Sequence, residues 1–105
     1  MATVTRNQEI AAIIIEQLGG IGKLSAMVGA NGFLAIDNGL QFTFKGWRKA
    51  NKCIITLDGS DLYTMTMGRL NKKTYDFKEA YNQEGLYWDM LKPEFERTTG
   101  LYLSL

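Results

Sequence analysis

The chain has 105 residues, of which 46% are hydrophobic and 22% charged, and its formal net charge is only +1. This composition is typical of a globular protein and excludes both a disordered chain and a polycation. We therefore treat residues 1–105 as a single domain, long enough to bury roughly two-thirds of its unfolded surface.

Two residue types exclude most enzyme mechanisms. The sequence contains no histidine, which excludes histidine-based catalytic triads, histidine zinc ligands and the usual general base near neutral pH. Cys53 is the only cysteine, so neither an intrachain disulfide nor a thiolate metal site can form, and a reducing compartment is indicated. We expect a non-enzymatic protein with no catalytic residue, no metal and no cofactor.

The N-terminal segment predicts one or two helices. Thr5 and Gln8 fit a capping box, and Gly19-Gly20 would end the helix that follows. A second, shorter apolar segment would place Ile21 on its inner side, together with Leu24 and Val28. The apolar run at residues 13–15 is too short to cross a bilayer, so we expect no membrane association.

Residues 40–69 predict three consecutive antiparallel strands, because apolar side chains recur at every second position. The turn at Asp58–Asp61 would join the second strand to the third. The side chains expected to point inward are Leu40, Phe42, Phe44, Cys53, Ile55, Leu57, Tyr63, Met65 and Met67.

The flanking segments extend this sheet. Asn38-Gly39 predicts a two-residue hairpin to a strand at residues 33–36, with Ala35 opposite Phe42 and Phe33 opposite Phe44. Residues 74–81 alternate again and predict a fifth strand. Asn82 would then cap a C-terminal helix, which Pro93 would either interrupt or restart. The expected fold is α+β: a four- to five-stranded antiparallel sheet, an N-terminal helix or two, and a C-terminal helix packed on the sheet.

This strand order gathers positive charge at one edge of the sheet. In a meander, the connection after the first of the three central strands and the end of the third lie at the same edge. Seven of the twelve Lys and Arg residues would meet there beside Trp47. The candidate binding residues, which we call the predicted basic edge, are Lys45, Trp47, Arg48, Lys49, Lys52, Arg69, Lys72 and Lys73.

The predicted basic edge has two interpretations. A tryptophan among cations offers a stacking plane and phosphate-neutralising charge, as a single-stranded nucleic-acid binder requires. The alternative is a charged sheet edge that resists aggregation, with the Trp47 ring folded inward over the sheet.

The C-terminal tail is apolar. Its side chains would pack on the sheet or pair across the two-fold interface of a homodimer. The residues in question are Leu101, Tyr102, Leu103 and Leu105.

Three segments carry a resemblance to a known family. Asp61–Arg69 (DLYTMTMGR), Gly85–Leu91 (GLYWDML) and Thr99–Leu105 (TGLYLSL) resemble a widespread family of small proteins from tailed phages and prophages, which has no assigned activity. The likeness spans most of the chain from Ile10 onward. It implies a phage origin and a host-cytoplasm setting, and it assigns no functional residue.

The sequence as a whole favours a small, non-enzymatic, phage-encoded accessory protein. It would act by binding a host or phage protein, which could be a component of host defence. One alternative is a nucleic-acid-binding protein that uses the predicted basic edge, with single-stranded nucleic acid as the partner. The other is a minor structural component of the virion.

Overall fold

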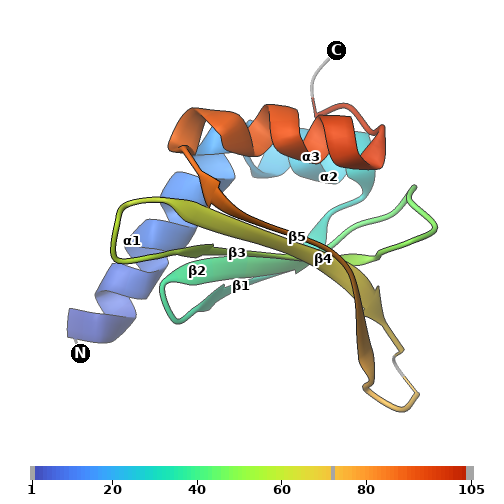
Figure 1. Ribbon diagram of the computed structural model, residues 1–105, viewed down its shortest axis with the longest axis horizontal. Helices are drawn as coiled ribbons and strands as arrows, with labels where there is room; N and C mark the ends of the chain where they lie inside the picture. The colour runs from blue at the N-terminus through green and yellow to red at the C-terminus, as the bar shows by residue number, and fades with distance from the viewer. Residues whose placement is uncertain (1, 72, 104–105) are drawn as a thin grey trace.

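The computed structural model describes residues 2–71 and 73–103, with side chains described from residue 6 onward. The elements are α1 (Ala2–Gln17), α2 (Ile21–Val28), β1 (Asn31–Ile36), β2 (Gly39–Thr43), β3 (Lys52–Leu57), β4 (Tyr63–Leu70), β5 (Phe77–Leu86), a 3₁₀ helix η1 (Trp88–Met90) and α3 (Leu91–Thr99). The strands form one antiparallel sheet in the order β1-β2-β3-β4-β5 (Figure 1). The α+β class and the meander order are therefore confirmed.

The core lies between one face of this sheet and the helices. Leu40 and Phe42 of β2 and Phe44 directly after it are buried, as are Cys53 and Ile55 of β3 and the alternating side chains of β4. Leu57 at the end of β3 is half-buried and packs against the core, so the predicted inward face is confirmed. Phe95 of α3 meets this face, with its ring centroid 5.2 Å from that of Phe44 in an edge-on arrangement. Aromatic pairs in this geometry add about 0.5–1.5 kcal/mol beyond the area they bury.

The N-terminal helix begins earlier than the capping pattern predicts. Since α1 starts at Ala2, Thr5 lies inside the helix and is not its N-cap. The predicted end is confirmed, because Gly19 and Gly20 both adopt positive φ after Gln17. In α2, Leu24 and Val28 are buried, but Ile21 is 52% exposed and does not share their inner side.

The predicted register of the first hairpin is wrong by two residues. Ala35 pairs with Leu40, and Ile36 with Gly39, so the turn consists of Asp37 and Asn38. Asn38 takes the positive φ of 56°, whereas Gly39 begins β2. Gly39 is needed for a different reason: a Cβ there would lie 2.2 Å from the carbonyl oxygen of Ile55 on β3. Glycine at this position permits close pairing of β2 and β3.

The predicted C-terminal boundaries also need correction. β5 runs from Phe77 to Leu86, so Asn82 is a strand residue whose side-chain amide donates to Thr66 Oγ1 at 2.9 Å. The helix starts only at Leu91, after η1. Pro93 lies in the first turn of this short helix, where its missing N–H has no intrahelical partner to lose. Pro93 was predicted either to interrupt a helix or to start a new one, and the second placement is close to the observed one.

Candidate binding site at the basic end of the sheet

Two chain connections meet at one end of the sheet. Residues 44–51 join β2 to β3, and residues 71–76 join β4 to β5. Because the sheet is a meander, both connections lie at the same end, and Figure 1 shows them projecting from the same side of the molecule. The cations predicted to form one basic edge sit on these two connections and on the strand ends beside them.

Asn51 fastens the first connection to β4. Its side chain accepts a hydrogen bond from the Leu70 N–H at 2.8 Å and donates one to the Leu70 carbonyl at 3.3 Å. Its backbone N–H also donates to the carbonyl oxygen of Gly68 at 3.0 Å. The loop is thus held beside Arg69, which lies between the two bonded residues. The sequence pattern placed Asn51 in a loop and gave no sign of this role.

The predicted cations take three different positions. Lys45, Arg48, Lys49, Arg69 and Lys73 are exposed to solvent at this end. Lys52 is half-buried, and its amine lies 5.9 Å from the ring centroid of Phe77, so its charge is engaged with an aromatic face. Lys72 lies outside the residues that the structure describes.

A further cation belongs to this group. Lys78 is exposed and pairs with Arg69 across β4 and β5. The alternating pattern of residues 74–81 could have located it, because an antiparallel strand after β4 must return past Arg69. We call the exposed set the basic end, and its charged members are Lys45, Arg48, Lys49, Arg69, Lys73 and Lys78.

Trp47 lies at the centre of the loop and is half-buried. Its side chain packs against the hydrophobic core, and the residue also lines an open pocket of about 520 Å³ with Gly46, Arg48 and Lys49. The C-terminal tail packs closely against this loop, because a Cβ on Gly46 would lie 3.0 Å from the Leu101 side chain. Trp47 therefore combines both expected roles, an anchor to the core and a wall of a surface pocket.

A smaller pocket of about 130 Å³ adjoins the loop between Gly29 and Asn51. Three of its polar side chains are already hydrogen-bonded, since Thr43 Oγ1 donates to Asn31 Oδ1 at 2.7 Å and the Asn51 side chain is bonded to Leu70, whereas Lys45 in its wall is exposed.

The ionisable groups elsewhere serve the fold. Within residues 2–71 and 73–103, no three acidic or thiol side chains are grouped to hold a metal ion. Cys53 is fully buried, and burial raises the pKa of its thiol, which keeps it protonated and unreactive.

One polar cluster joins β5 to α3. The Tyr81 hydroxyl and the Arg97 guanidinium both donate to the carboxylate of Glu94, which is only 7% exposed. Burial, followed by the hydrogen bond to Glu94, raises the pKa of Tyr81 to about 12. Burial acts to raise the pKa of Glu94 as well, but the hydrogen bonds from Tyr81 and Arg97 outweigh it and lower this pKa below its usual value. The cluster fixes the C-terminal helix on the sheet.

The tail residues separate into inner and outer positions. Leu103 is fully buried and Leu101 is half-buried, whereas Tyr102 is 69% exposed. The Leu103 N–H donates to Glu96 Oε2 at 2.8 Å, which anchors the tail to α3. Leu105 lies outside the described residues.

Comparisons with known proteins add no family to this description. No protein-family model, no curated protein sequence and no solved structure matches the chain.

Among the described residues, no single helix is long and apolar enough to span a membrane. Arg6–Gln17 and Ile21–Val28 meet that test only when they are taken together, as a pair bent by 57°.

Proposed function

We propose that this protein is a small, non-enzymatic, phage-encoded accessory protein that binds a host or phage protein in the host cytoplasm. The observation that carries the proposal is that exposed cations gather at one end of the sheet, where two of them, Arg48 and Lys49, line the Trp47 pocket. The loop at residues 44–51 contains no acidic residue, and residues 69–79 around the β4–β5 connection contain two, Asp76 and Glu79. Such a surface is complementary to an acidic patch on a partner protein and would steer its approach.

A second candidate function is single-stranded nucleic-acid binding through the same end. The Trp47 pocket favours it, because a base could enter beside the ring while Arg48 and Lys49 contact the phosphates. A third candidate, a minor component of the virion, follows from the proposed phage origin alone.

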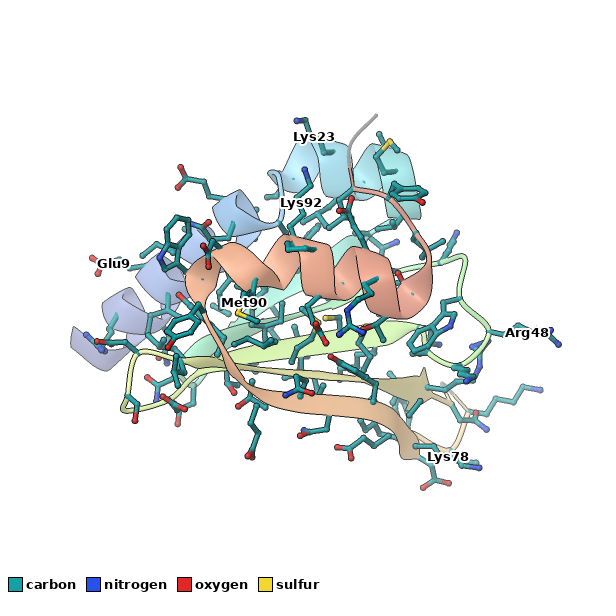
Figure 2. All side chains as sticks on the ribbon, turned by 45° about the horizontal axis from the view of Figure 1, so that its top comes forward. Glu9, Lys23, Arg48, Lys78, Met90 and Lys92 are labelled. Atoms are coloured by element: carbon teal, nitrogen blue, oxygen red, sulfur yellow. The ribbon has the colours of Figure 1, made fainter. Side chains whose placement is uncertain are left out.

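The test is a titration of the protein with poly-glutamate and with a single-stranded oligonucleotide at increasing salt. Binding should weaken as salt rises, because exposed charges are screened over about 8 Å at physiological ionic strength. Arg48→Glu with Lys49→Glu should abolish binding and leave the melting temperature unchanged, since exposed substitutions rarely cost more than about 0.5 kcal/mol. Lys23→Glu, an exposed cation on α2 away from this end, is the control (Figure 2).

Three further results separate the candidates. Trp47→Ala should weaken oligonucleotide binding by about 1–3 kcal/mol if the ring stacks on a base. Affinity purification from infected cells would identify a protein partner, and detection in purified particles would favour the virion role. Failure of the wild type to bind either polyanion at low salt would reduce the basic end to a solvated sheet edge.

A further inference from the structure

Three large apolar side chains are exposed within four residues where β5 leads into α3. Tyr87 is 60% exposed, Trp88 58% and Met90 38%, although all three belong to a short segment attached to the core through Leu86 and Leu91. Tyr, Trp and Met are the residue types enriched in the centres of protein interfaces. We call these three residues the aromatic patch.

The aromatic patch lies at the opposite end of the sheet from the basic end. Leu86 pairs with Tyr63, the first residue of β4, so the patch follows the strand end at which the β1–β2 and β3–β4 turns also lie. Figure 2 shows the same separation, with Glu9 and Met90 toward one side of the molecule and Arg48 and Lys78 at the other.

The charges at this end are predominantly negative. Exposed carboxylates occur in both turns, near the end of β5 and within η1, and they belong to Asp37, Asp58, Asp61, Glu84 and Asp89. Arg6 is also close, because its neighbour Asn7 donates to Asp37 Oδ1 at 3.2 Å. Lys92, two residues after Met90, adds a second cation, and Glu9 adds a sixth carboxylate on this side of the molecule (Figure 2). The carboxylates still outnumber the cations around the aromatic patch.

We propose that the aromatic patch docks onto the basic end of a second copy of this chain, so that the protein associates head to tail. In this assembly the basic end of one copy receives the aromatic patch of the next. The inference therefore rests on the proposed function, and it identifies the acidic surface that the basic end binds as the aromatic-patch end of a second copy. The signs of charge are complementary, and an exposed Trp88 ring faces an open pocket on the other copy. That pocket, about 520 Å³, falls within the range that encloses small ligands, so it can receive an indole ring.

The geometry of the contact determines how far the assembly grows. The two surfaces differ, so the contact is heterologous and leaves one unused end on each terminal copy. Association by this contact continues beyond a dimer unless its rotation closes a ring.

The test uses two variants that each lose one end by neutral substitution, so that no charge-swapped contact can form. Trp88→Ala with Asp89→Asn removes the aromatic patch, and Arg48→Gln with Lys49→Gln removes the receptor. There are two matched controls. One combines Ile21→Ala with Glu16→Gln, and the other is Lys23→Gln alone; both change exposed residues on the α1–α2 side of the molecule. Melting temperatures establish that every variant is folded, and sedimentation equilibrium measures molecular mass at low salt.

The wild type and both controls should increase in mass with concentration, and association should weaken at least tenfold at 1 M salt, where screening acts over about 3 Å. Each end variant alone should remain monomeric. Their equimolar mixture should form a 1:1 dimer and no larger species, because it contains one intact pair of surfaces.

Three outcomes would overturn the proposal: a monomeric wild type at every concentration, a wild-type dimer that does not grow, and a mixture of end variants that stays monomeric. A monomeric wild type that binds an arginine-rich peptide at the aromatic patch would assign the patch to a foreign partner instead. Poly-glutamate binding by that same monomer would leave the proposed function standing.

Discussion

At the scale of single residues, the Glu94 carboxylate shows how tertiary contacts change the meaning of a sequence position. The sequence places Glu94 on a helix rich in charge, where a solvated position is the ordinary expectation. In the structure its carboxylate is buried and accepts hydrogen bonds from Tyr81 of β5 and Arg97 of α3. No pattern in the sequence identifies this pairing, because it depends on where β5 ends and how α3 is placed.

Removing the Tyr81 hydroxyl should destabilise the fold. Tyr81→Phe keeps the ring but leaves the buried Glu94 carboxylate without one of its donors, and an unsatisfied buried group of this kind costs about 1–3 kcal/mol. Urea unfolding measures the loss. Tyr87→Phe is the control, since that tyrosine is 60% exposed and should change the free energy of unfolding by less than about 0.5 kcal/mol.

The same cluster should make stability depend on pH at both extremes. The pKa of Glu94 is lowered by folding, so its contribution is present above the unfolded value of about 4.3 and is lost as pH falls through the folded value. The pKa of Tyr81 is raised by folding to about 12, so its contribution is complete below the unfolded value of about 10 and is lost as pH rises toward 12. A pH series of urea midpoints tests both, and Tyr81→Phe should flatten the alkaline decline.

At the scale of elements, the sequence predicts which segments form strands better than where those strands begin and pair. The alternation of Leu40, Phe42 and Phe44 determines which face is buried, because a strand with one apolar face has one stable orientation. The two-residue error in the first hairpin arises because contact between β2 and β3 determines the place of Gly39. The late end of β5 likewise escapes prediction, because Gln83 and Glu84 are exposed strand residues with no apolar alternation.

The buried end of the tail should contribute substantially to stability. Leu103→Ala removes a fully buried side chain and should lower the free energy of unfolding by about 2–5 kcal/mol. Tyr102→Ala is the matched control, because the Tyr102 side chain, next to Leu103 in the sequence, is 69% exposed. Equal melting temperatures for the two variants would contradict the observed packing of the tail.

The Asn51 side chain should control the attachment of the basic loop to β4. Asn51→Ala deprives both the N–H and the carbonyl of Leu70 of their side-chain partner, and we expect a loss of about 1–3 kcal/mol and faster hydrogen exchange at the Leu70 amide. Asn82→Ala removes a single exposed hydrogen bond to Thr66 and is the control. Unchanged exchange at Leu70 would show that backbone pairing alone holds the loop.

At the scale of the whole molecule, the meander sorts the connections by charge. Cations occupy the two connections at one end, and carboxylates occupy the two turns at the other. The sequence predicts the convergence of Lys45, Arg48 and Lys49 with Arg69 because strand order follows from the hairpins. It leaves open whether Trp47 faces solvent or folds inward, and it does not predict the contact of Lys52 with Phe77, since both depend on side-chain packing in three dimensions.

Lys78 should act as part of the basic end even though it lies on β5. If an anionic ligand covers both connections, Lys78→Gln and Arg69→Gln should each reduce the slope of log affinity against log salt by about one. Lys23→Gln should leave the slope unchanged. A normal slope for Lys78→Gln, together with a reduced one for Arg69→Gln, would exclude β5 from the contact and confine the ligand to the loop at residues 44–51 and Arg69 beside it.

The positions of the two tryptophans give the molecule an optical reporter at each end. Trp47 stands among cations and Trp88 beside carboxylates, so iodide should preferentially quench the fluorescence of the first indole and caesium that of the second. Trp47→Phe or Trp88→Phe leaves a single emitter with a known location. The intrinsic emission of the protein can therefore identify which end a ligand occupies, without an added dye.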